Sequence, residues 1–257
     1  MPFRHYCRAF VGAALLSAAP LFSYAQEQPA VDPEALELLK AMSDYLVPLK
    51  QFTARGEVIR EDVLGSGQKL MSHYQFQLAV QRPNKLHLAR QSADKDLELF
   101  YDGEQFTLFG KLQQVYATTK APPTIDETLD YAADVLEIPA SGRDLIYEDV
   151  YDELLSDVVS GNHMGQAIID GVLCEYLAFR SDDADWQIWI EQGERPLPRK
   201  YVITSRWLTG APMYAVRFRE WDVSANLSDA QFVFNAPADA SKIQFHSALS
   251  RAKTKDK

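Results

Sequence analysis

The chain has 257 residues, 47% of them hydrophobic and 24% charged, which is enough for one large β domain or two small ones with a sizeable core. Its net charge is −10 at pH 7. A balance of this sign repels nucleic-acid phosphates and anionic lipid surfaces alike, so we expect no nucleic-acid partner.

The N-terminal stretch has the pattern of a secretory signal peptide. Arg4 and Arg8 make a basic start, and Phe10–Phe22 form an apolar run that is too short to span a bilayer. Ser23-Tyr24-Ala25 is a small-x-small cleavage site. Cys7 lies in the basic region and not at this site, which disfavours a lipid anchor. We therefore expect residues 1–25 to be removed and the mature protein to be soluble in the periplasm.

Cleavage leaves Cys174 as the single cysteine, which excludes an intramolecular disulfide. It lies in the middle of an apolar run, where a buried small hydrophobe is expected rather than a nucleophile.

The first predicted element is a helix. Asp32-Pro33-Glu34 begins it, with Asp32 as the N-cap and proline in the first helical position. One face then carries residues at helical spacing, namely Leu36, Leu39, Met42, Ser43 and Leu46. Pro48 ends the helix.

From Phe52 the apolar period changes to two, which is typical of half-buried strands. Six strands are predicted between Phe52 and Thr118, with connections of a few residues such as the tight turn Asp102-Gly103. Such a succession predicts an antiparallel sheet of high curvature or a barrel.

A helical insert interrupts this sheet after Pro122-Pro123. Thr124-Ile125-Asp126-Glu127 is a capping box that opens a helix to about Ile138. A second, more acidic helical piece is predicted at about Asp149–Val158.

The sheet resumes at about His163–Ile169 and continues through a meander between Gly171 and Arg206. Within that meander, Trp186–Ile190 carries bulky apolar side chains on both faces, so both sides of the sheet must be covered, one of them by a helix, a second sheet or a ligand. Tyr214–Trp221 and a short final strand at Phe232–Phe234 complete a count of about eleven strands. We expect one domain over residues 26–250 and a disordered basic tail at 251–257.

Catalytic and metal-binding signals are weak. The mature chain's histidines, His73, His87, His163 and His246, are isolated from one another, whereas a zinc site needs paired ligands at short spacing. Asp182, Asp183 and Asp185 lack the spacing and closing glutamate of a calcium loop and suit a solvated turn. Acidic residues that could hide a catalytic pair, but equally suit a polar helix face, are Glu148, Asp149, Asp152, Glu153 and Asp157. We expect no metal and no cofactor.

Four short motifs resemble those of the periplasmic lipoprotein carriers LolA and LolB, in the same order and spacing. They are Leu49–Ala54 (LKQFTA), Gln81–Leu86 (QRPNKL), Tyr101–Phe109 (YDGEQFTLF) and Phe232–Pro237 (FVFNAP). In closer detail the chain resembles a family of predicted periplasmic proteins known only as a domain of unknown function. The resemblance implies a mainly β (α+β) fold, an unclosed antiparallel barrel with an N-terminal helix and a helical lid over an acyl-chain cavity, and no catalysis.

The resemblance also implies site residues. The arginine of the Arg-Pro-Asn corner helps to hold the lid shut in these carriers, and Arg82 occupies this position here. The alternative is that Arg82 is an ordinary turn residue with a solvated side chain. Lid residues facing the cavity would be Leu129, Ala133 and Leu136. The predicted cavity residues are Tyr74, Phe76, Leu78, Leu88, Leu99, Tyr101, Phe106, Leu108, Trp186 and Ile188.

We therefore expect a monomeric, non-catalytic carrier or sensor that binds the acyl chains of a lipid or a lipidated protein. One alternative is a protein-interaction module in envelope stress sensing, with an envelope protein as partner. A second is a hydrolase that uses the scattered carboxylates.

Overall fold

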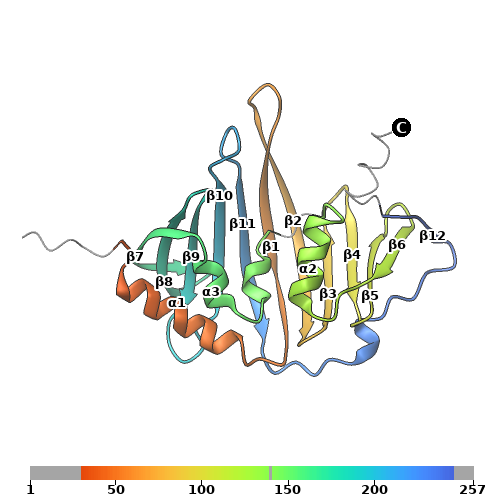
Figure 1. Cartoon of the computed structure of the whole chain (residues 1–257), viewed down its shortest axis with the longest axis horizontal. Coiled ribbons are helices and arrows are strands. Elements are labelled where there is room, and N and C mark those ends of the chain that lie inside the picture. Colours follow the sequence, from red (N-terminus) through yellow and green to blue (C-terminus); the bar gives the residue numbers. More distant parts are fainter. Residues whose placement is uncertain (1–29, 139–140, 246–257) are drawn as a thin grey trace, which may run out of the picture.

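The computed structural model describes residues 30–138 and 141–245 (Figure 1). The predicted signal peptide, His246 and the predicted tail at 251–257 lie outside these residues.

Within the described residues, twelve strands form one sheet, in the order β12-β6-β5-β4-β3-β2-β1-β11-β10-β9-β8-β7. The bounds are β1 Gln51–Val63, β2 Lys69–Gln81, β3 Lys85–Gln91, β4 Asp96–Tyr101, β5 Gln105–Gly110, β6 Val115–Lys120, β7 Val158–Ile169, β8 Val172–Ser181, β9 Ala184–Glu191, β10 Pro198–Ser205, β11 Met213–Asp222 and β12 Ser241–Lys242. Neighbours pair antiparallel except β12 and β6, which are parallel. In the described part of the chain the edge strands β12 and β7 do not meet, so the sheet is unclosed. This confirms the predicted fold class.

The helices begin where their capping residues predict. α1 (Pro33–Leu46) is capped by the Asp32 carboxylate, which accepts a hydrogen bond from the Glu34 N–H at 3.0 Å. The insert contains α2 (Ile125–Asp134), the 3-10 turn η1 (Arg143–Ile146) and α3 (Val150–Leu155). α2 ends before the predicted Ile138, because Glu137 takes a φ of +56° and turns the chain out of the helix.

All three α-helices lie on one face of the sheet, which we call the inner face (Figure 1). Strand side chains point alternately to the two faces, so every second residue of β1 from Phe52 to Val58 is buried there. The apolar side chains among them join Leu39 and Met42 of α1 in one continuous core.

Both faces of the sheet are covered at Trp186–Ile190, as predicted, and the helices lie only on the inner one among the described residues. Trp186 and Ile188 belong to the main core, whereas Trp189 belongs to a small outer cluster with Cys174. Trp189 stacks on Tyr176 at a centroid distance of 4.5 Å. Side chains of the sheet itself therefore shield Trp189, with no second sheet or helix over it in the described residues. Cys174 is fully buried, as predicted.

The strand predicted at Phe232–Phe234 is wrong. The chain passes along one end of the sheet to the 3-10 turn η2 (Asp229–Gln231), and these residues follow it (Figure 1). Phe234 then packs on the rings of β4, β5 and β6 without joining the sheet. Phe232 is fully buried, and Phe234 lies 5.4 Å from Phe100, ring centre to ring centre. The aromatic pattern indicates burial, and this segment is buried without strand pairing.

No helix among the described residues has both the length and the apolar character to cross a bilayer.

Candidate functional site

The structure brings the predicted cavity residues together on the inner face. Seven are buried in the main core, namely Phe76, Leu78, Leu99, Tyr101, Phe106, Trp186 and Ile188. Tyr74, Leu88 and Leu108 are partly buried and pack against it. In this closed arrangement the space between sheet and helices is occupied by the protein's own side chains. Contact of these residues with a ligand stays a prediction.

Two of the three predicted lid residues, Leu129 and Leu136, are buried in the same core. Ala133 is half-buried outside this core, and its neighbour Ala132 is buried there instead, because the helix turns the adjacent residue toward the sheet. Hydrogen bonds fix the start of α2 to the sheet. The Ile125 N–H donates to the Pro83 carbonyl at 2.9 Å, and the Tyr101 hydroxyl donates to the Pro122 carbonyl at 2.7 Å. The helix is thus anchored near its N-terminus and otherwise meets the sheet through apolar side chains.

Arg82 does not form the predicted bonds to lid carbonyls. Its Nε and Nη2 atoms are buried and have no hydrogen-bond partner among the described groups. The reason is the direction of α2, which points its N-terminus at the corner that contains Arg82. A helix N-terminus offers N–H donors, and arginine has only donors, so the two cannot pair. The Pro83 carbonyl takes the lid's N–H instead.

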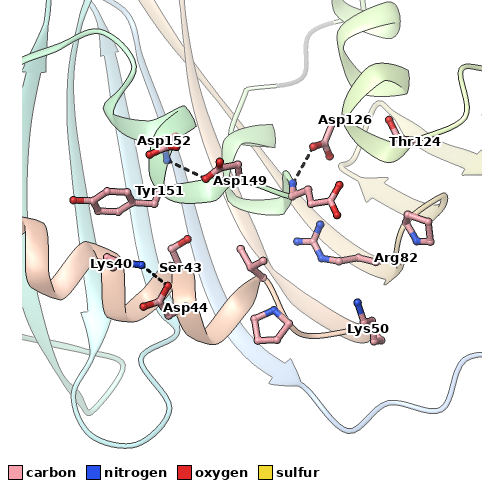
Figure 2. Close-up of a pocket in the computed structure, with 14 residues that line it drawn as sticks. Lys40, Ser43, Asp44, Lys50, Arg82, Thr124, Asp126, Asp149, Tyr151 and Asp152 are labelled. Atoms are coloured by element: carbon pink, nitrogen blue, oxygen red, sulfur yellow. Dashed lines mark hydrogen bonds and ion pairs between the residues drawn. The ribbon is translucent and has the colours of Figure 1, made fainter.

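Arg82 instead lines a cavity of about 1000 Å³ between α1, the β2–β3 corner and the insert (Figure 2). Most of the residues that line it have polar side chains. The full set is Lys40, Ser43, Asp44, Val47, Pro48, Lys50, Arg82, Pro83, Thr124, Asp126, Glu148, Asp149, Tyr151 and Asp152. The cavity adjoins the core, because Val47 and Tyr151 line the cavity and also pack against core residues.

Some of the charges in this cavity have structural partners. Lys40 Nζ lies 2.7 Å from Asp44 Oδ1 on α1. Asp149 accepts a hydrogen bond from the Asp152 N–H and so caps α3. Asp126 accepts a hydrogen bond from the Glu148 N–H at 2.9 Å.

Burial perturbs the remaining charges. Burial lowers the pKa of Arg82, while Asp126 and Glu148 nearby favour its charged form. Burial also raises the pKa of Asp126, against the hydrogen bond from Glu148 and the attraction of Arg82. The Arg82 Nε and Nη2 atoms have no hydrogen-bond partner among the groups that the structure describes. The cavity is therefore lined by a partly desolvated cation with two unpartnered nitrogen donors.

Sequence reasoning missed this cavity. Lys40 and Lys50 gave no signal in the sequence, and Asp126 was visible only as part of a capping box. The acidic piece around Asp149 was recognised, but its position opposite Arg82 depends on how the insert folds back over the sheet.

The other polar candidates are separate from this cavity. His163 lies between two carboxylates, with Nε2 2.7 Å from Glu175 and Nδ1 3.2 Å from Glu34. Asp185 binds Arg180 through two hydrogen bonds of 2.6 and 3.0 Å at a hairpin. Across residues 30–138 and 141–245, no three His, Cys, Asp or Glu side chains gather as a metal site.

The fold and this site define a half-barrel protein with a helical cover and a charged cavity at one end of its core. The family model described as predicted periplasmic protein (DUF2092) matches residues 35–246, and the chain belongs to this family. The predicted family is therefore confirmed. A comparison with curated protein sequences gives no match.

Solved structures with a similar arrangement have low sequence identity to this chain. LprF from Mycobacterium bovis is 12% identical with a TM-score of 0.48, over 82% of this chain and 99% of that chain. The Mycobacterium tuberculosis lipoprotein LppX is 15% identical with a TM-score of 0.45, over 77% and 100%. A LolA superfamily protein from Nitrosomonas europaea is 12% identical with a TM-score of 0.39, over 78% and 97%. At these values the similarity does not bear on function.

Proposed function

We propose that the protein is a non-catalytic carrier or sensor that binds the acyl chains of a lipid or a lipidated protein between the inner face of its sheet and its helices. The observation that supports this most is the attachment of α2. The helix is held at its N-terminal end by Pro83 and Pro122, and Leu129 and Leu136 then rest on apolar side chains of the core. A helix attached in this way can lift from one end.

The energetics of exchange suit a carrier. Lifting α2 uncovers apolar surface, and an acyl chain that enters covers that surface again. Burial of each methylene group is worth about 0.8 kcal/mol, so a long chain is held firmly without a covalent bond or a cofactor. One carboxylate of the acidic piece, Asp149, has a structural task as the cap of α3.

The proposal includes export and assembly. Residues 1–25 would be removed as a signal peptide, and residues 26–250 would act in the periplasm as one soluble, monomeric domain.

Binding of an apolar probe tests the proposal. A dye that fluoresces in apolar surroundings should bind the native protein saturably at one site, and a fatty acid or phospholipid should displace it. Native protein that binds no displaceable dye would contradict an acyl-chain site.

A second candidate function, a protein-interaction module of the envelope, is favoured by one surface. The hairpins β1–β2 and β10–β11 project beyond the sheet (Figure 1) and carry exposed apolar side chains at their tips, Leu64, Trp207 and Leu208. Trp207 is 69% exposed. If this surface binds a protein, Trp207→Ser should abolish a stoichiometric complex and leave the binding of apolar dye unchanged.

A further inference from the structure

The cavity around Arg82 has walls of opposite charge. Arg82 and Lys50 stand on the side formed by the β2–β3 corner and the start of β1, whereas Asp126 and Glu148 belong to the helical insert (Figure 2). The guanidinium of Arg82 extends into the space between the two sides.

The cationic wall suits a phosphate group. Arg82 lines the cavity, and a guanidinium binds phosphate oxygens through charge-assisted hydrogen bonds. Its Nε and Nη2 donors are covered and have no acceptor among the described residues, so a phosphate reaches them when the side chain shifts toward the cavity. Lys50 lines the same wall and forms no ion pair with a described residue, so it can add a second positive charge.

The acidic wall restricts which phosphate compounds fit. Asp126 and Glu148 repel a ligand that is only anionic, because like charges across a partly desolvated space are unfavourable. A ligand that carries an ammonium group a few atoms from its phosphate turns this repulsion into attraction. The cavity volume of about 1000 Å³ is large enough for such a group.

We propose that this cavity receives the zwitterionic headgroup of a phospholipid, with the phosphate on Arg82 and Lys50 and the ammonium facing Asp126 and Glu148. The proposal rests on the proposed function, because the acyl chains of the same lipid would enter the adjoining core. Val47 and Tyr151, which belong to both cavity and core, mark where headgroup and chains would meet.

The experiment compares three lipids with identical acyl chains: phosphatidylethanolamine, phosphatidylglycerol and diacylglycerol. Each is offered to the purified protein in detergent micelles, and the retained lipid is quantified after gel filtration. We expect phosphatidylethanolamine to be retained about tenfold more than either of the others, which corresponds to about 1.4 kcal/mol.

Variants separate the two walls. Arg82→Gln should lower phosphatidylethanolamine retention about tenfold and leave diacylglycerol retention unchanged, whereas Glu148→Gln should raise phosphatidylglycerol retention relative to phosphatidylethanolamine. Lys50→Gln changes an exposed residue and should weaken phosphatidylethanolamine retention about threefold without a risk to folding. The matched controls Arg55→Gln and Glu220→Gln, at an exposed ion pair of 2.9 Å, should change neither.

The outcomes distinguish the headgroup site from the carrier function. Equal retention of the three lipids by the wild type and all variants would overturn the headgroup site and leave acyl-chain binding intact. Preference for phosphatidylglycerol would overturn the role of the acidic wall. Retention of none of the lipids would overturn both proposals.

Discussion

Replacing Arg82 by methionine should stabilise the protein, although the substitution removes a charge from the candidate site. Two nitrogen atoms of Arg82 are buried and have no partner among the described residues. A buried polar group without a hydrogen bond costs about 1–3 kcal/mol, and methionine fills similar space with a flexible apolar chain. Asp126 and Glu148 favour the cation and offset part of this cost. We therefore expect the free energy of unfolding to rise by about 1–2 kcal/mol.

The assay is urea denaturation followed by tryptophan fluorescence, supported by thermal unfolding, where the midpoint should rise by about 2–6 °C. Arg55→Met serves as the control, because Arg55 is exposed and its replacement should change stability by less than about 0.5 kcal/mol. A loss of 1 kcal/mol or more in Arg82→Met alone would refute this reasoning, since Arg82 would then form the structural bonds that the sequence resemblance implied.

Three further predictions concern other parts of the chain. N-terminal sequencing of the exported protein should begin at Gln26, and recovery of the unprocessed chain in the cytoplasm would contradict export. Burial lowers the pKa of His163, but the carboxylates of α1 and β8 beside it raise that pKa above its usual value overall. The stabilisation that protonated His163 provides should therefore be complete below about pH 6.5 and be lost as the pH rises through the raised pKa. In urea titrations, His163→Gln should lower the free energy of unfolding more at about pH 6 than at about pH 9. An equal loss of stability at both pH values would exclude this linkage. Gly56→Ala would place a Cβ atom 1.9 Å from a carbonyl oxygen of β11 and should destabilise by about 2 kcal/mol or more, whereas Gly65→Ala at an open hairpin tip should be neutral in the same assay.

Local sequence signals predicted most of the fold. Asp32 and Thr124 lie at helix starts because each supplies a side-chain acceptor for a free N–H, which is a property of a few neighbouring residues. The alternation of apolar and polar residues from Phe52 to Val58 also predicted a half-buried strand, because this local pattern determines which face of the strand is buried.

Features that depend on contacts with residues distant in the sequence could not be predicted from local patterns. The aromatic residues at Phe232–Phe234 indicated burial correctly but not the way it is achieved, because a segment that packs on the side chains of a sheet needs no strand pairing. β7 begins at Val158, before the predicted His163. Its start follows from pairing with β8, whose register no local pattern fixes.

The apolar core beside the candidate site was predictable in composition, whereas the polar cavity around Arg82 was not. The apolar residues of the inner face were identified from their alternation, and they do form one core. The environment of Arg82 could not be predicted from the sequence. It depends on which end of α2 meets the β2–β3 corner and on how the insert brings Asp126 and Glu148 near the guanidinium.

Native mass spectrometry of the protein purified from its own envelope tests the proposed carrier function most directly. If acyl chains bind under the helices, part of the protein should carry one additional mass that matches a phospholipid or a lipidated protein, and that mass should be lost on denaturation. Protein found only at its own mass, or bound only to a stoichiometric protein without lipid, would contradict a carrier and favour the interaction module.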